Sequence, residues 1–269
     1  MFTAVESVRR PAPPRLPLEL RWGADGNPLP VRTVRAPGRK RAPAIGLEAP
    51  PWLPTGPADQ PFDFSGHVHR LCADVVRGCE ELRHIDVSRL LFGMTQARSG
   101  RLHGLQARVT PLRFRGGGLQ RLRHGIPYQV QRYFIDGREM LYLVTFCLPR
   151  FLDQGFDEKF VTLFHELFHI SPAFDGDLRR LGGRYDVHSH SKRAYDQHMA
   201  RLAREYLSNG ADPNLHAFLR LNFAQLQHRH GSVAAVVVPR PKLIPLTGGF
   251  AEPGAGAEQG PDHAALRHP

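Results

Sequence analysis

The sequence is poor in cysteine and lacks any long apolar run. Its 269 residues include three cysteines (Cys72, Cys79 and Cys147), too few for a disulfide framework, which favours small buried thiols in a reducing compartment over metal or redox sites. No stretch of about 18 apolar residues occurs, so no membrane span is predicted. The opening MFTAVESVRRPAPPRLP lacks the apolar centre of a secretory signal, and we expect a cytoplasmic protein.

Acidic residues are fewer than basic ones. Lys and Arg total 36 against 25 Asp and Glu, which gives a formal net charge of +11. The cations are spread along the whole chain without a block of five or six in a row, so a dedicated nucleic-acid tail is not indicated, and no basic stripe is interleaved with aromatic residues. An association with DNA is an expectation that rests on net charge only.

Proline sets the predicted domain limits. Residues 1–60 hold 12 of the 24 prolines, and we expect a largely disordered basic tail because proline lacks the N–H that helices and central strands need. Short pieces such as LELRW could still dock on the core. Residues 61–230 carry periodic apolar patterns and should form the folded domain. Residues 231–269 are predicted to hold a strand and a proline-rich segment, then a disordered tail.

Helical and strand-like patterns follow one another through the predicted domain. A helix should begin near Phe62, and four strand-like segments follow it: DVSRLLFGM, GLQARVTPLRF, YQVQRYFID and MLYLVTFCLPRFL. RGGG predicts a turn, and DGRE predicts a hairpin. Three further helices are expected in DEKFVTLFHELFHI, SHSKRAYDQHMARLAREYL and LHAFLRLNFAQLQHR. This order predicts an α+β fold with a small, mostly antiparallel sheet packed against helices.

The stretch FHELFHI places three titratable side chains inside an apolar helical run. Positions four apart share a helix face, so His165 and His169 can aim their imidazoles at one point, as two ligands of Zn²⁺ do. Glu166 lies about 100° around the helix axis from His165 and can reach a water molecule instead, as a general base does. Without partners these buried groups would be costly. A metal ion offsets that cost, and hydrogen bonds to neighbouring side chains would also do so.

A catalytic zinc needs a third protein ligand and an open position for water. The segment GRYDVHSHSKRAYDQH offers His190, our first choice because it lies at the start of the next helix. His188 is an alternative, since it would face the same side in an extended segment. An acid, Asp175 or Asp186, is a further alternative. Taken alone, HSH would be interpreted as a solvent-exposed helix cap, with Ser189 or the next serine as N-cap.

The chain resembles a family of peptidases in this region. A helix, strands, a helix with HELFH, a glycine-broken connector and then a histidine and an aromatic residue at a helix start are similar to the minimal zincin metallopeptidases, in particular the SprT-like and phage-type groups. The resemblance covers roughly residues 62–210, and its specific motif is the five-residue HELFH. In HSKRAYD, Ser191 replaces the usual glycine and the aromatic residue comes one place later.

The resemblance implies a zinc metallopeptidase, a hydrolase that cleaves peptide bonds in a peptide or protein substrate. Zn²⁺ would be held by His165, His169 and His190. Glu166 would act as general base on a metal-activated water.

Two further features of the resemblance concern the substrate. Tyr185 is expected to help stabilise the oxyanion, with Arg184 and His188 as alternatives. The strand MLYLVTFCL would lie beside the HELFH helix as an edge to which a substrate peptide adds, although its own residues favour ordinary core.

Two rival functions stay open at this point. A non-catalytic zinc protein would use the same three histidines, with the fourth position closed by a side chain such as Asp175. A nucleic-acid-binding module would keep the histidines as structural residues and bind in a salt-dependent manner that chelators do not change.

Overall fold

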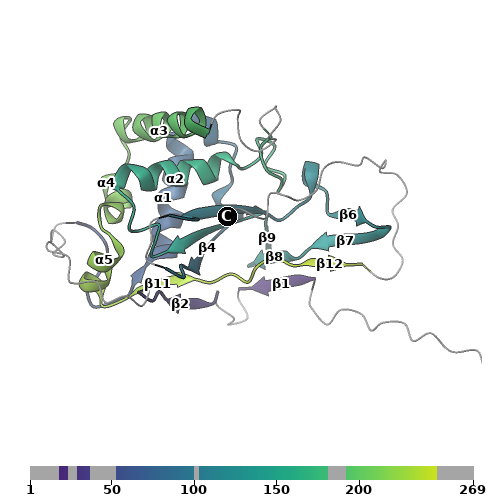
Figure 1. The fold of residues 1–269 in the computed structure, drawn as a ribbon, viewed down its shortest axis with the longest axis horizontal. Coiled ribbons are helices and arrows are strands. Elements are labelled where there is room, and N and C mark those ends of the chain that lie inside the picture. Colours follow the sequence, from purple (N-terminus) through teal and green to yellow (C-terminus); the bar gives the residue numbers. More distant parts are fainter. Residues whose placement is uncertain (1–17, 24–28, 37–52, 100–102, 181–191, 247–269) are drawn as a thin grey trace, which may run out of the picture.

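The computed structural model describes residues 18–23, 29–36, 53–99, 103–180 and 192–246 (Figure 1). Within these ranges no helix combines the length and the apolar character that crossing a lipid bilayer requires. The fold is α+β, as predicted, with small sheets whose strand pairs are mostly antiparallel.

Short strands outnumber helices in this part of the chain. The helices are α1 (Phe64–Gly78), α2 (Phe156–Phe168), α3 (Lys192–Ser208), α4 (Pro213–His216) and α5 (Phe223–His230). The strands are β1 (Glu19–Trp22), β2 (Val31–Thr33), β3 (Phe62–Asp63), β4 (Leu90–Gln96), β5 (Ala107–Pro111), β6 (Gln120–Arg123), β7 (Ile126–Val130), β8 (Arg132–Ile135), β9 (Arg138–Met140), β10 (Tyr142–Leu148), β11 (Val233–Val236) and β12 (Leu243–Pro245). They form four three-stranded sheets, ordered β4-β10-β5, β1-β8-β9, β2-β11-β3 and β12-β7-β6.

The sheet β4-β10-β5 separates two apolar cores. Because side chains alternate along a strand, Tyr142, Val144 and Phe146 of β10 face the larger core, which also contains the buried sides of α1, α2 and α3. Leu143 of the same strand faces a smaller core built with Tyr133 of β8. Figure 1 shows α2 between these strands and α3.

The edge position expected for MLYLVTFCL is wrong, and the alternative of ordinary core is right. β10 is the middle strand of its sheet, parallel to β4 and antiparallel to β5. Both of its sides are paired along its length, so no substrate strand could add to it. The nearly continuous apolar composition of β10 follows from this position, since both of its faces are buried.

Helices α1 and α2 form where the sequence predicts them. The Asp63 side chain caps α1 by accepting a hydrogen bond from the N–H of Gly66 at 3.0 Å. The three cysteines are free and buried, as expected. In α2, Asp157 and Glu158 lie in the first turn, where they complement the helix dipole.

The DGRE turn is confirmed, but the strand that follows it divides. Asp136 and Gly137 both have positive φ, 48° and 74°, as a two-residue type I′ hairpin turn requires. The turn joins β8 to β9. After one residue, Leu141, the chain enters β10 in a different sheet. The RGGG turn is also present, as a short 3₁₀ segment over Arg115–Gly117.

The last predicted helix is wrong as a single element. The chain forms α4, a 3₁₀ turn at Ala217–Arg220 and then α5. Asn222 is the reason for the break: its side chain accepts from the N–H of Gln225 at 2.9 Å, and the Gln225 side chain accepts from the N–H of Asn222 at 2.9 Å. This reciprocal capping box begins a new helix.

Two short pieces of the proline-rich N-terminal region lie at sheet edges. LELRW docks as β1, parallel to β8, and β2 pairs antiparallel with β11. Edge positions tolerate neighbouring prolines because one side of the strand needs no ladder partner. The rest of the predicted tail, at 1–17, 24–28 and 37–52, lies outside the described residues, as does the predicted tail from 247 onward.

Lys159 of α2 is a buried cation with a structural role. The side chain is 2% exposed, and Nζ donates to the carbonyl oxygens of Leu219 and Leu221, both at 2.8 Å. It thereby ties α2 to the turn between α4 and α5. Burial lowers the pKa of Lys159 to about 8, and the negative charge of Asp153 opposes that shift.

The shifted pKa of Lys159 predicts a pH-dependent stability. Between pH 8 and 10.5 the unfolded chain retains a proton on Lys159 that the folded chain has released, so the free energy of unfolding rises with pH across that window. The free energy of unfolding of the parent chain should rise by up to about 3 kcal/mol across this window, relative to that of Lys159→Met. Urea denaturation between neutral and alkaline pH measures it, with the exposed Lys242→Met as control. Parallel stability curves for the parent and Lys159→Met would contradict the assignment.

Candidate metal centre

His165 and His169 lie side by side at the C-terminal end of α2. Their ring centroids are 4.6 Å apart, with an angle of 76° between the ring planes. His169 is buried, and the His165 side chain is 20% exposed. The spacing of four residues therefore brings the two imidazoles together at a point that solvent can reach.

Glu166 points from α2 to the neighbouring strand β5. Its Oε2 accepts a hydrogen bond from the backbone N–H of Val109 at 2.6 Å. Burial raises the pKa of Glu166 to about 7, although the bond from Val109 and the positive charge of Arg108 both act to lower it. A carboxyl group with this pKa can exchange a proton near neutral pH.

The sheet edge next to α2 is β5, which the sequence did not indicate. The carbonyl of Gln106 and the N–H of Leu112 both form hydrogen bonds toward β10, at 2.8 and 3.0 Å. Because such bonds alternate along an antiparallel pair, the peptide groups of Ala107, Val109 and Pro111 face away from β10. Glu166 therefore contacts the outer edge of this sheet.

Tyr195 and Asp196, at the start of α3, lie next to the two histidines. The Tyr195 ring centroid lies 4.7 Å from that of His165 and 5.7 Å from that of His169, nearly parallel to the latter ring. Asp196 Oδ1 lies 3.7 Å from His165 Nδ1. Burial, and then the negative charge of Glu166, raise the pKa of Tyr195 above its usual range.

The sequence signalled only one of these two α3 residues. Tyr195 is the aromatic residue of the HSKRAYD string and belongs to the apolar face of the predicted helix, which indicated a buried position. Asp196 has no such signal, because an acid on an amphipathic helix is usually solvated. Only the crossing of α2 and α3 brings it near His165.

Asp175, one of the alternative third ligands, belongs to a turn in the connector after α2. Its Oδ1 accepts from the N–H of Asp177 at 3.1 Å, and Asp177 Oδ2 in turn accepts from the N–H of Gly116 at 3.1 Å. These bonds join the connector to the turn that follows β5. The structure does not bring Asp175 together with the histidine pair.

The other expected ligands and donors lie in 181–191, outside the described residues. These are His190, His188, Asp186, Tyr185 and Arg184, together with the two serines proposed as N-caps. Within the part of the chain that the structure describes, no three His, Cys, Asp or Glu side chains are grouped so that they could hold a metal ion. Of the predicted site, the structure thus brings His165 and His169 together, and it places Glu166 on the same helix with its carboxyl group bonded to β5.

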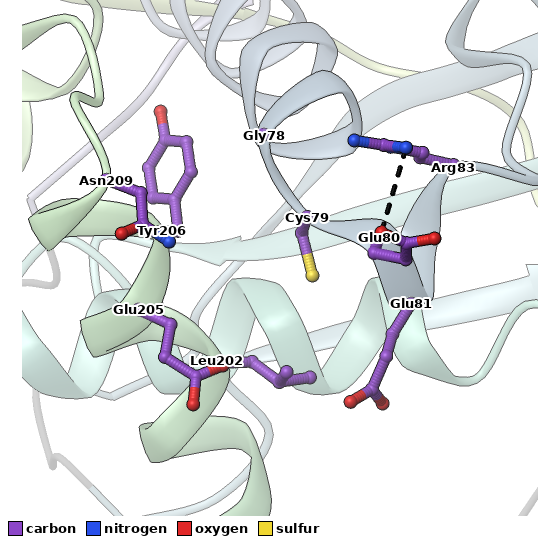
Figure 2. A pocket seen from close by; sticks show the side chains of 9 residues that line it. All are labelled: Gly78, Cys79, Glu80, Glu81, Arg83, Leu202, Glu205, Tyr206 and Asn209. Carbon is purple, nitrogen blue, oxygen red and sulfur yellow. Dashed lines mark ion pairs between the residues drawn. The ribbon is translucent and has the colours of Figure 1, made fainter.

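A hollow of about 310 Å³ lies elsewhere, between the end of α1 and α3 (Figure 2). Cys79, Glu80 and Glu205 are among its lining residues. Figure 2 shows the ion pair between Glu80 and Arg83, whose charged atoms are 3.7 Å apart. Since the lining includes neither histidine of α2 nor Glu166, we do not count this hollow as part of the candidate site.

Comparison with known proteins gave no match: no family model, no curated protein and no solved structure is significantly similar to the chain. The residues of the candidate site offer two adjacent imidazoles, a buried carboxyl group beside them, an aromatic ring across them and an acid near one imidazole.

Proposed function

We propose that the protein is a zinc-dependent metallopeptidase of the zincin type, a hydrolase acting on peptide bonds of a peptide or protein substrate. One observation carries the proposal: at the end of α2, two imidazoles 4.6 Å apart adjoin a buried carboxyl group that is held by a sheet edge. A cytoplasmic location and an association with DNA stay predictions from the sequence.

The donor set fits a zinc ion. Imidazole nitrogens are preferred zinc ligands, and a ligating histidine commonly has a carboxylate near its other ring nitrogen. Asp196, near Nδ1 of His165, suits that outer role and leaves Nε2 of the ring for the metal. We propose His165, His169 and His190 as the three ligands. A zinc ion there would polarise a peptide carbonyl and make a water molecule more acidic.

The protein's own groups would move the protons and position the substrate. Glu166 would take a proton from the attacking water and return it to the leaving nitrogen, which suits a carboxyl group beside the histidine pair. Tyr185 is proposed as a donor to the developing oxyanion. A substrate could pair as an added strand with the outward-facing peptide groups of β5 other than the N–H of Val109, which Glu166 occupies, and Pro111, which has no N–H.

Metal analysis tests this proposal directly. The purified chain should contain about one equivalent of zinc, and His165→Ala and His169→Ala should each lose it. His198→Ala is the matched control, because His198 lies on α3 with its Nε2 bound to Glu81 at 2.9 Å. Folded variants at His165 and His169 that retain the full zinc content would refute the site.

The two rival functions make different predictions. A non-catalytic zinc protein would pass the metal analysis but show no peptide hydrolysis that depends on Glu166. A nucleic-acid module with structural histidines would bind DNA or RNA equally well after chelator treatment. Neither rival gives a role to a carboxyl group that is buried next to two imidazoles and whose pKa is raised to about 7, a combination typical of functional sites.

A further inference from the structure

A second feature of the fold is a basic arm, formed by β6, β7 and the turn between them. His124 and Gly125 of the turn both have positive φ, 49° and 75°, as a type I′ hairpin requires. β12 pairs with β7, and β6 lies at the edge of this sheet. Figure 1 shows the arm extending away from the helices.

The arm exposes apolar side chains to an unusual degree. Of the seven large hydrophobic residues that are exposed in the described part of the chain, four belong to the arm or border it: Leu119, Leu122, Ile126 and Leu243. Leu122 is the most exposed of the seven, at 66%. Such a concentration of exposed apolar surface is typical of an interaction site.

The charged side chains of the arm itself are all cationic, and the acids Asp175 and Asp177 lie against the turn that precedes β6. Arg115, Arg121, Arg123 and Lys242 are exposed on it or next to it. No Asp or Glu occurs anywhere from Val87 to Ile135, or from Ser232 to Ala251. A partner for this surface must therefore combine negative charge with apolar groups.

The outer edge of β6 presents main-chain groups for pairing. Arg123 and Ile126 flank the two-residue turn and so form a hydrogen-bonded pair, and these pairs alternate along the strands. The N–H and C=O groups of Gln120 and Leu122 consequently point away from β7. Arg121 and Arg123 share one face of the arm, and Leu122 lies on the other.

We propose that β6 binds an extended acidic segment of another polypeptide, in which carboxylate and aliphatic side chains alternate, as an added strand. The partner backbone would pair with the outward groups of Gln120 and Leu122. Its carboxylates would meet Arg121 and Arg123 on one face, and its aliphatic side chains would cover Leu122 on the other. This inference does not rest on the proposed hydrolase activity.

Two other occupants fit the arm less well. Phosphates of a nucleic acid only accept hydrogen bonds, so they would leave the outward carbonyls of β6 without donors. A second copy of the chain, paired through its own β6, would place arginines against arginines, and like charges opposite each other are destabilising. An acidic peptide provides both N–H donors for the outward carbonyls of β6 and negative charge for its arginines.

Binding of short fluorescent peptides to the full chain, followed by anisotropy, tests the proposal. A peptide that alternates Val and Glu should bind, whereas one with the same residues in two blocks and one that alternates Val and Lys should not. Arg121→Glu with Arg123→Glu should weaken binding at least about tenfold. The matched charge control is Arg77→Glu with Arg83→Glu, which should have no effect; both arginines are exposed, Arg77 in the last turn of α1 and Arg83 five residues after that helix ends.

A proline substitution separates strand pairing from charge. Leu122→Pro deletes an N–H that faces away from β7, so the hairpin itself keeps its ladder. It should weaken binding more than Leu122→Ala does. Equal binding of the alternating and block peptides, or no binding of either, would overturn the proposal. The arginines would then serve only to prevent the exposed edge of β6 from pairing with other chains. Tighter binding of a DNA duplex, lost with the two arginines, would overturn it in favour of a nucleic-acid surface.

Discussion

Glu166→Gln is expected to lower kcat for peptide hydrolysis by about 10²- to 10⁴-fold while leaving the bound zinc unchanged. Glutamine has the same shape and can still accept the hydrogen bond from Val109 through its amide oxygen, so the local fold should persist. It cannot take a proton from water. The loss should therefore appear in kcat, with KM little changed.

The measurement uses a quenched fluorescent unfolded protein as substrate and metal analysis of each variant. Glu158→Gln is the matched control, because Glu158 lies exposed in the first turn of the same helix, where it accepts from the N–H of Gly155. It should retain the activity of the parent. If the Glu166 variant were as active as the parent, Glu166 would not be the base. Zinc in the parent without any hydrolysis would favour the non-catalytic rival.

His190→Ala is expected to lower zinc affinity by at least about 100-fold, the upper end of what loss of an outer-shell partner costs a metal site. Removing a direct ligand should cost no less than that. His188→Ala, two residues away and with the same change in side chain, should retain near-parental affinity. Titration against a zinc indicator in a competing chelator measures both variants.

The reverse pattern would move the third ligand to His188 and overturn our choice. If neither variant lost zinc, the remaining candidate for the third ligand would be the acid Asp186, because Asp175 is engaged in its turn with Asp177. In that case Asp186→Asn should be the variant that releases the metal.

Local patterns in the sequence predicted most helices and turns, because the forces that form them act over a few residues. Asp63 caps α1, and Asp136-Gly137 turns the β8–β9 hairpin, as those residue types usually do. The break before α5 also has a local cause, the capping box formed by Asn222 and Gln225, but the apolar spacing across this point predicted a single helix. There the capping residues outweighed the periodicity.

Sheet order and the surroundings of the site could not be read in the same way. The apolar composition of β10 indicated burial, but nothing local identified its partner strands or marked β5 as an edge, because pairing partners come from distant parts of the chain. The helical spacing of His165 and His169 sufficed to bring them together. The position of Asp196 depends on how α3 crosses α2, and that crossing follows from the packing of the whole core.

The support of Glu166 by a main-chain donor has a consequence for mutational scanning. Replacing Val109 with any residue other than proline keeps its N–H, so an alanine scan of β5 would miss the group that orients the carboxylate. Only proline, or a one-residue slip of β5 along β10, would take that donor away. The side chain at position 109 can therefore vary with the needs of packing, because the backbone N–H alone keeps the Glu166 carboxylate aligned.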